Sequence, residues 1–200
     1  KDEGMSSKSI EEASGTTTTD TTSTWTGTKQ LGTSSDDNAS GVATDSSGNV
    51  YVTGETEGGL DNNTSAGSAD LFVVKYNSSG TKQWTKQLGT SSYDNASGVA
   101  TDSSGNVYVA GVTYGGLDGN SNQDNADLFV VKYNSSGTKQ WTKQLGTSSG
   151  DSFDPSSGEY ARGVATDSSG NVYVTGVTEG DLDGASAGFH DLFVVKYNSS

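Results

Sequence analysis

The sequence predicts an all-β chain built from short antiparallel strands, and three observations lead to this fold class. The dodecapeptide GVATDSSGNVYV occurs three times without a change, at residues 41–52, 98–109 and 163–174. A second block, DLFVVKYNSS, follows each copy, at residues 70–79, 127–136 and 191–200. No window has the 3.6-residue period of a helix, whereas Val, Tyr, Thr and Trp dominate the regular segments. Repeats of this size are typical of propellers, solenoids and arrays.

The first two strands of a unit form a hairpin, as the second unit illustrates. Gly98–Thr101 is followed by the turn residues 102–106 and then by Val107–Gly111, in which alternate residues take opposite faces. Asp opens such a turn through its side chain, and Gly or Asn adopts a positive φ at low steric cost. We therefore expect two strands joined by a tight turn.

The third and fourth strands follow a polar loop. Leu128–Tyr133 is apolar on both faces, which is typical of a strand buried between neighbouring sheets. The pattern predicts burial between blades for its central valine in every unit, namely Val73, Val130 and Val194. A second turn, 134–137, leads to Thr138–Leu145, where Trp flanked by Lys and Thr indicates an outer, half-exposed strand.

Four antiparallel strands joined by tight turns make one sheet, and a single sheet cannot bury both of its faces. Repetition around an axis buries them. The sequence therefore predicts a β-propeller-type array of four-stranded antiparallel blades, with three blades in this chain. The blade units cover about residues 33–88, 89–145 and 146–200, the strand 25–32 completes a blade, and residues 1–24 form a flexible Ser/Thr-rich leader.

The repeat resembles a known family. GVATDSSGNVYVTG, a Gly/Asp/Asn loop and DLFVVKYNSSGTKQW together are similar to the bacterial SBBP-type β-propeller repeat, over about residues 25–200. The resemblance implies a bacterial extracytoplasmic propeller, because members are mostly surface, secreted or lipoprotein chains without an assigned reaction. It carries over no catalytic residue. The family name refers to seven blades, and this chain holds three.

The two edges of the array predict how it is completed. A fourth-strand sequence, WTGTKQLG at residues 25–32, stands before the first unit with Trp25 and Leu31 as its large apolar residues, and the third unit stops before its own fourth strand. Three blades are fewer than the about 4 to 8 of known rings. Either the chain is part of a longer protein, or two copies form a six-bladed ring by exchanging this strand. We expect self-association through exposed strand edges, or an extracellular protein or glycan ligand.

Composition excludes several classes of function. The 25 Asp and Glu residues outnumber the 11 Lys and Arg residues, so the net charge of −14 repels nucleic acid. Without cysteine there is no disulfide and no thiolate chemistry. No apolar run reaches the ~18 residues of a transmembrane segment. The leader is typical of a lipid-anchored surface protein, although an ordinary linker has the same composition, and we expect an extracellular or cell-surface location.

One loop has the pattern of a calcium site. Oxygen-bearing side chains occur at every second position and can converge on a hard cation, as in calcium loops. The candidate ligands are Asp118, Asn120, Asn122 and Asp124. The pattern decays in the other units and has no bidentate Glu, so an Asp/Asn/Gly turn bonded to its own backbone is the alternative. No other cofactor is expected.

The third unit carries a one-copy insertion, residues 150–162, and loops of this kind often carry function. Its candidate binding residues are Asp151, Asp154, Glu159 and Arg162. They suit a sugar-binding or acid/base site, or simply a surface salt bridge. His190 is a lone loop histidine, and no Ser/His/Asp set, zinc spacing or phosphate loop occurs. We therefore expect a non-catalytic module for adhesion, scaffolding or self-assembly; the alternative is a carbohydrate-active extracellular enzyme that uses the insertion.

Overall fold

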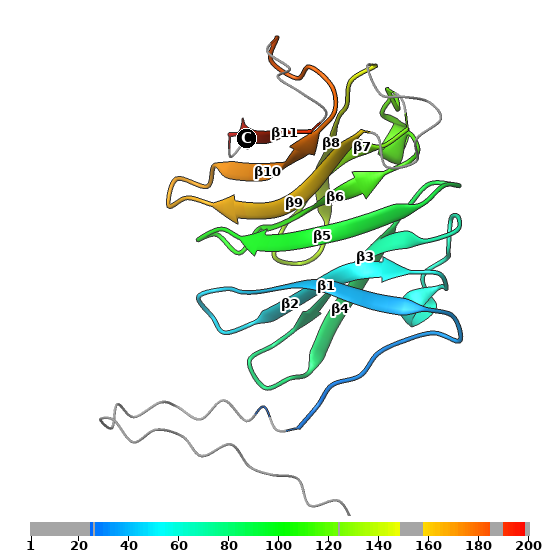
Figure 1. Cartoon of the computed structure of the whole chain (residues 1–200). Coiled ribbons are helices and arrows are strands. Elements are labelled where there is room, and N and C mark those ends of the chain that lie inside the picture. The colour runs from blue at the N-terminus through cyan, green and yellow to red at the C-terminus, as the bar shows by residue number, and fades with distance from the viewer. Residues whose placement is uncertain (1–24, 26, 124, 149–157, 185–189, 199–200) are drawn as a thin grey trace, which may run out of the picture.

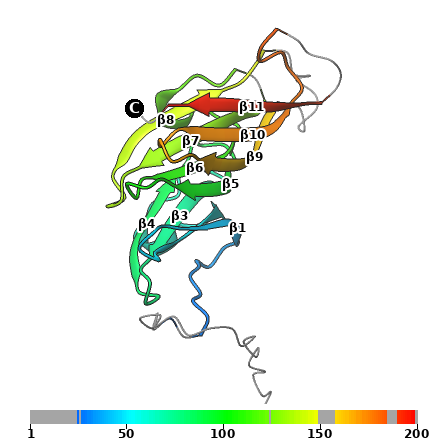
Figure 2. The same cartoon turned by 90° about the vertical axis from the view of Figure 1, so that its left-hand side faces the viewer.

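The computed structural model describes residues 25, 27–123, 125–148, 158–184 and 190–198. Three antiparallel sheets lie one above another in a row (Figure 1), and the same row is seen from the side in Figure 2. The first sheet contains β1 (Asp37–Thr44), β2 (Val50–Thr56), β3 (Asp70–Tyr76) and β4 (Lys82–Leu88). The second contains β5 (Asp94–Thr101), β6 (Val107–Thr113), β7 (Asp127–Tyr133) and β8 (Lys139–Leu145). The third contains β9 (Glu159–Thr166), β10 (Val172–Thr178) and β11 (Asp191–Tyr197). Short 3-10 turns, η1 (Leu60–Asn62) and η2 (Leu117–Gly119), follow β2 and β6.

The predicted all-β fold class is confirmed, and the first two sheets have the predicted four strands in sequence order. The first strand of each unit begins earlier than the sequence suggests. In β5 it starts at Asp94 rather than Gly98, because a bulge between Ala96 and Gly98 shifts the register and pairing with β6 continues beyond it. This extra length brings the start of the strand to the junction with the neighbouring sheet.

The tight turns use the chemistry that the sequence predicts. Oδ1 of Asp102 accepts hydrogen bonds from the backbone N–H groups of Ser104 and Asn106, at 2.9 Å each. Its Oδ2 accepts from Asn106 Nδ2 at 2.8 Å and from the Tyr108 hydroxyl at 3.0 Å. Gly105 has φ of 75°, which a residue without Cβ adopts freely. The turns at Asp45 and Asp167 repeat these contacts.

Two hydrophobic cores lie between the sheets. Between the first and second sheets, Leu71 and Val73 of β3 pack against Val109 and Phe129 of the next sheet. Between the second and third sheets, Leu128 and Val130 take the same places. Each core is also linked by backbone hydrogen bonds, since N–H of residue 94 donates to the carbonyl of residue 69 (2.9 Å) and N–H of residue 159 to that of residue 126 (2.8 Å). The described residues therefore contain two junctions between neighbouring sheets, and the two have equivalent contacts.

The prediction for the third core strand is wrong in one respect. Val73 and Val130 are fully buried, whereas Val194 is 64% exposed and its neighbour Leu192 is 82% exposed. The reason is positional, because the described residues place no sheet on that face of β9–β11. At the opposite end of the row, Val42 is 67% exposed while its counterpart Val99 is 8% exposed. Identical sequences therefore differ in burial only because of their place in the row.

The segment formed by residues 25 and 27–32 is not a paired strand among the described residues, although the sequence predicts one over residues 25–32. It crosses the outer face of the first sheet, where Trp25 and Leu31 pack against Phe72, Val74 and Tyr76. The rings of Trp25 and Tyr76 meet edge to face, with centroids 5.7 Å apart. Whether this segment completes a blade remains a prediction.

Candidate functional site

The copies of the repeat are so similar that the positions at which they differ stand out. On the first two strands, most of the differences fall at one end of the hairpin, where Asn38 pairs with Glu55 and Tyr160 pairs with Val177. The residues that break the repeat there include Asp36, Glu55, Glu57, Tyr93, Tyr114, Tyr160, Arg162 and Glu179. Since β1 lies against β5 and β5 against β9, these ends meet at the junctions between sheets.

At the first junction, the Glu55 carboxylate connects two sheets. It accepts a hydrogen bond from Asn38 Nδ2 at 3.3 Å and from Asn95 Nδ2 at 2.9 Å. Asn95 also donates to the Tyr93 hydroxyl at 2.9 Å. Burial and the contact with Glu55 raise the pKa of Tyr93, so its hydroxyl is neutral at physiological pH, and the residue remains 37% exposed.

The contacts continue across the second junction. The Tyr93 and Tyr114 rings meet edge to face with centroids 6.0 Å apart, and the Tyr114 and Tyr160 hydroxyls are 2.8 Å apart. The Arg162 guanidinium lies 5.8 Å from the centre of the Tyr160 ring. Burial and the hydrogen bond with Tyr114 raise the pKa of Tyr160 well above its ordinary value. We call the residues Glu55, Tyr93, Asn95, Tyr114, Tyr160 and Arg162 the tyrosine track, because they form one line across all three sheets.

The tyrosine track has the chemistry of a binding surface. Tyrosine offers an apolar ring and a polar tip at low entropic cost. Carboxylate, amide and guanidinium groups beside the rings supply directional hydrogen bonds for a polar ligand. The track ends near Glu179, whose Oε1 lies 2.9 Å from His190 Nε2, so His190 has a partner that the sequence did not predict.

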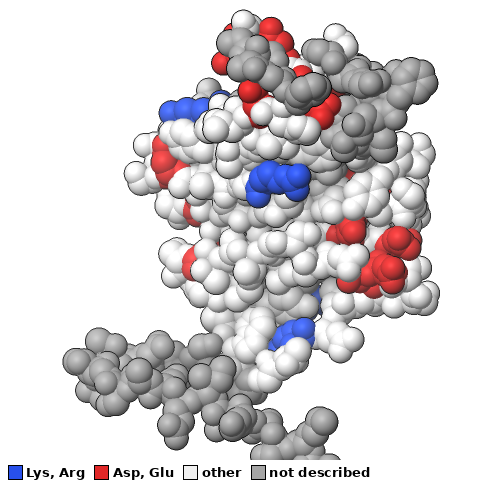
Figure 3. All heavy atoms as spheres, in the orientation of Figure 1, with Lys and Arg blue, Asp and Glu red and all other residues white. Residues whose placement is uncertain are grey.

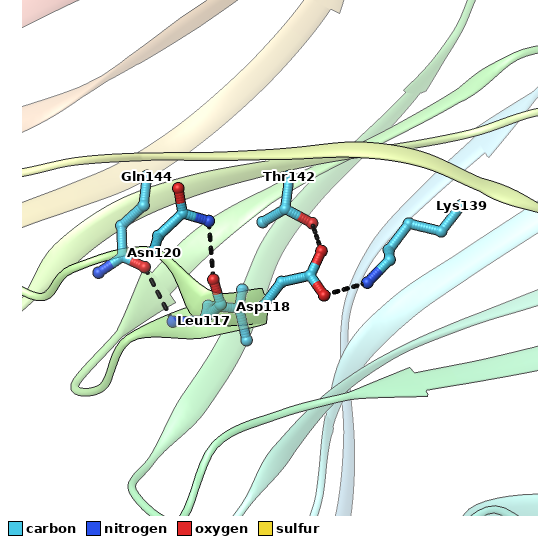
Figure 4. A network of polar contacts seen from close by, with 6 residues as sticks. All are labelled: Leu117, Asp118, Asn120, Lys139, Thr142 and Gln144. Carbon is cyan, nitrogen blue, oxygen red and sulfur yellow. Dashed lines mark hydrogen bonds and ion pairs between the residues drawn. The ribbon is translucent and has the colours of Figure 1, made fainter.

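The predicted calcium ligands are engaged with protein groups (Figure 4). Asp118 forms an ion pair with Lys139 and accepts from the Thr142 hydroxyl at 2.9 Å. Asn120 Nδ2 donates to the Leu117 carbonyl at 2.8 Å, and Asn122 Oδ1 lies 3.4 Å from Gln144 Nε2. Asp124 lies outside the described residues. These contacts tie the loop to β8, and calcium binding here remains a prediction.

The prediction of binding residues in the insertion is wrong for Glu159. Glu159 is fully buried at the start of β9, where Thr147 donates through its backbone N and its hydroxyl at 3.0 Å each, and the Thr178 hydroxyl donates at 2.8 Å. It takes the place of Asp94, which binds Thr90 and Thr113 in the same way. Glu159 therefore holds the fold together and is unavailable to a ligand. Asp151 and Asp154 lie outside the described residues, and Arg162 belongs to the tyrosine track.

Sequence reasoning missed Glu55, Tyr93, Asn95 and Tyr114. The available signal was the comparison of the copies with one another, since Asp36 becomes Tyr93 and Glu57 becomes Tyr114 in otherwise unchanged surroundings. Only the bulged register shows that these positions, more than twenty residues apart along the hairpin, share one junction.

Most of the surface on the side that carries β1, β5 and β9 consists of uncharged side chains (Figure 3). Figure 3 shows acidic side chains gathered at one edge of this face and few basic ones. Within the described residues, no three metal-binding His, Asp or Glu side chains cluster. No helix in this part of the chain is long and apolar enough to cross a membrane.

Two curated proteins resemble the chain over most of its length. The regulatory protein FlaEY of Caulobacter vibrioides is 32% identical over 158 residues, which is 71% of this chain. An uncharacterised WD repeat-containing protein of Acanthamoeba polyphaga mimivirus is 28% identical over 169 residues, or 70% of this chain. The chain spans only 16% and 12% of the length of these two proteins.

A family model also matches the chain, once in each repeat. The model for the SBBP β-propeller repeat matches residues 27–61, 83–118 and 140–183, which together are more than half of the sequence. The matched segments run from the outer strand of one unit through the hairpin of the next, in agreement with the three stacked sheets. This chain belongs to the SBBP β-propeller repeat family.

Proposed function

We propose that this chain is a non-catalytic β-propeller module that acts by binding, in adhesion, scaffolding or self-assembly at the bacterial surface. The observation that carries the proposal is the tyrosine track, in which residues that break the repeat gather into one line across all three sheets. Repeat scaffolds of this kind keep their strands and vary the residues that meet a ligand. The ligand that suits tyrosine rings beside carboxylate and amide groups is an extracellular glycan.

The proposal of an extracellular or cell-surface location rests on the repeat family and on the composition of the leader, residues 1–24. An acidic surface suits a module that stays clear of anionic lipid and nucleic acid. The names of the two curated relatives, a regulatory protein and a WD repeat-containing protein, favour a module without catalytic activity. The burial of Glu159 also removes one carboxylate from the enzymatic alternative.

The test is a glycan array probed with the 200-residue chain and with Tyr93→Ala. Tyrosine is enriched among the few interface residues whose truncation costs more than about 1 kcal/mol, so we expect affinity to fall at least about 5-fold. Asp36→Ala is the matched control, because Asp36 occupies the same repeat position in the first unit and lies outside the track. Equal binding by both variants, or the absence of any glycan ligand, would refute the proposed ligand surface. Turnover in a hydrolase screen would instead favour the enzymatic alternative.

A further inference from the structure

The third sheet has an open edge within the described chain. β3 pairs with β4 and β7 pairs with β8, whereas β11 pairs only with β10. A groove of about 840 Å³ runs along β11, lined by Leu145, Gly180, Leu182, Asp191, Leu192 and Val194 among others. An unpaired strand edge beside an apolar groove is a template for strand addition.

The occupied edges of the first two sheets define what such a strand must supply. Gln144 of β8 donates through Nε2 to the Gly115 carbonyl at 3.0 Å and to Asp127 at 2.8 Å, and its Oε1 accepts from Leu117 N at 2.9 Å. Gln87 of β4 makes the same three bonds in the first sheet. One glutamine thus ties the outer strand to the loop between the second and third strands. The corresponding groups of the third sheet belong to Gly180, Leu182 and Asp191, which line the groove.

A segment with this glutamine lies at the other end of the chain. Residues 28–33 read TKQLGT, as do residues 85–90, so that Gln30 corresponds to Gln87 and Leu31 to Leu88. Thr33 binds Asp37 through its backbone N (2.5 Å) and its hydroxyl (3.1 Å), as Thr90 binds Asp94.

The segment is also seated as a fourth strand is seated. A Cβ atom placed on Gly80 would lie 2.8 Å from Lys29 Cε and 3.0 Å from Trp25 Cδ2. A Cβ atom on the equivalent Gly137 would lie 2.8 Å from the Cε of residue 86 and 3.0 Å from the Cδ2 of residue 84, both on β4. The segment therefore rests on the first sheet as β4 rests on the second sheet.

The two end faces of the row, the outer face of the first sheet and the exposed face of the third sheet, are complementary. A cavity of about 300 Å³ lies between the segment and the first sheet. Most of its lining is apolar and includes Leu60, Phe72 and Val74, and Lys29, Gln30 and Asp37 also line it. At the internal junctions the third-strand residues Leu71 and Val73, or Leu128 and Val130, fill the equivalent space. Their counterparts in the third sheet, Leu192 and Val194, are exposed.

We propose that β11 of one copy of this chain pairs with residues 27–32 of a second copy, so that the third sheet of the first copy stacks on the first sheet of the second. This inference rests on the self-assembly part of the proposed function and names the partner. Gln30 sets the register by binding Gly180, Leu182 and Asp191, and Leu31 lies opposite Leu192, as Leu88 lies opposite Leu71. A second copy is the occupant because residues 28–33 have the sequence of the internal fourth strand and are seated on the first sheet as that strand is seated. Two copies bring together six sheets, within the about 4 to 8 of known rings.

Light scattering of the 200-residue chain tests the assembly. We expect twice the chain mass of 20.5 kDa. Gln30→Ala should weaken the pair about 10- to 100-fold, because it removes the hydrogen bonds that the Gln30 side chain makes to Asp191, Gly180 and Leu182 across the interface. The control Gln140→Ala removes the same side chain from an exposed position of β8 and should leave the pair unchanged. A monomer at every concentration, or equal effects of the two variants, would overturn the proposal.

Cross-linking tests the register and keeps the test decisive if a variant assembles poorly. The chain has no cysteine, so Leu31→Cys mixed with Leu192→Cys should yield a disulfide-linked pair, since facing residues bring their Cβ atoms within reach. Leu31→Cys mixed with Val194→Cys is two residues out of register, so its Cβ atoms lie too far apart, and it should not link. Linkage within a single chain in a variant that carries both Leu31→Cys and Leu192→Cys, or equal linkage in both mixtures, would contradict pairing between copies.

The same preparations separate this inference from the proposed ligand. If the chain binds a glycan but stays monomeric, only the proposed strand exchange is rejected, because the tyrosine track lies within a single chain. If the cysteine variants cross-link in the expected register but the chain binds no glycan, only the proposed ligand surface is rejected.

Discussion

Replacing the same valine in two copies of an identical strand should produce opposite results. Val130→Asp removes a fully buried side chain, whose burial stabilises the fold by about 1.5–3 kcal/mol. It also places a carboxylate in an apolar layer, at a cost of several kcal/mol. The combined loss of more than about 5 kcal/mol is comparable with the about 5–15 kcal/mol that stabilises a typical domain, so we expect Val130→Asp to prevent folding.

Val194→Asp changes the same position of the third sheet, where the side chain is 64% exposed. The carboxylate stays hydrated, and only about a third of the valine's burial is lost, which amounts to about 0.5–1 kcal/mol. We therefore expect a folded protein that no longer pairs with a second copy.

Urea unfolding followed by tryptophan fluorescence, at a protein concentration low enough to keep the chain monomeric, measures both effects. Similar losses of unfolding free energy in Val130→Asp and Val194→Asp would refute our account of the end faces. The two strands have the same sequence and differ only in whether another sheet covers them. A soluble, folded Val130→Asp would show that this strand does not form the core between the sheets.

The remaining predictions concern an acid-sensitive turn and the calcium loop. Burial raises the pKa of Asp102, but hydrogen bonds from Asn106, Tyr108 and Ser104 outweigh it and leave this pKa below its ordinary value. Its contribution to stability is therefore complete above the unfolded-state pKa of about 3.9 and is lost as the pH falls through the folded-state value, so Asp102→Ala should flatten the decline in melting temperature between roughly pH 5 and 2. An equally steep decline in the variant would contradict this assignment. For the loop, millimolar calcium should raise the melting temperature of the chain but not that of Asp118→Ala; a melting temperature unaffected by calcium would leave Asp118 only its contacts with Lys139 and Thr142.

The sequence predicted less of the candidate site than of the fold. Arg162 stood out in the sequence because it lies in a one-copy insertion, and it belongs to the tyrosine track. Glu159 stood out for the same reason, yet it is the buried partner of Thr147 and Thr178. Both residues occupy β9, and the pleat of the strand sends one toward solvent and the other into the sheet. The sequence did not predict that β9 begins at Glu159, so the alternation of faces could not be applied to these two residues.

The sequence by itself determined the strands, the turns and the stacking of sheets, because each depends on local chemistry repeated three times. The carboxylate of Asp102 and the positive φ of Gly105 act within a few residues, and the two-sided apolar pattern of residues 128–133 requires a cover on both faces. Only the tertiary structure decided which copies of that pattern are covered. Val130 is buried and Val194 is exposed in the same sequence, since burial between sheets is a property of the neighbouring sheet and not of the strand that carries the valine.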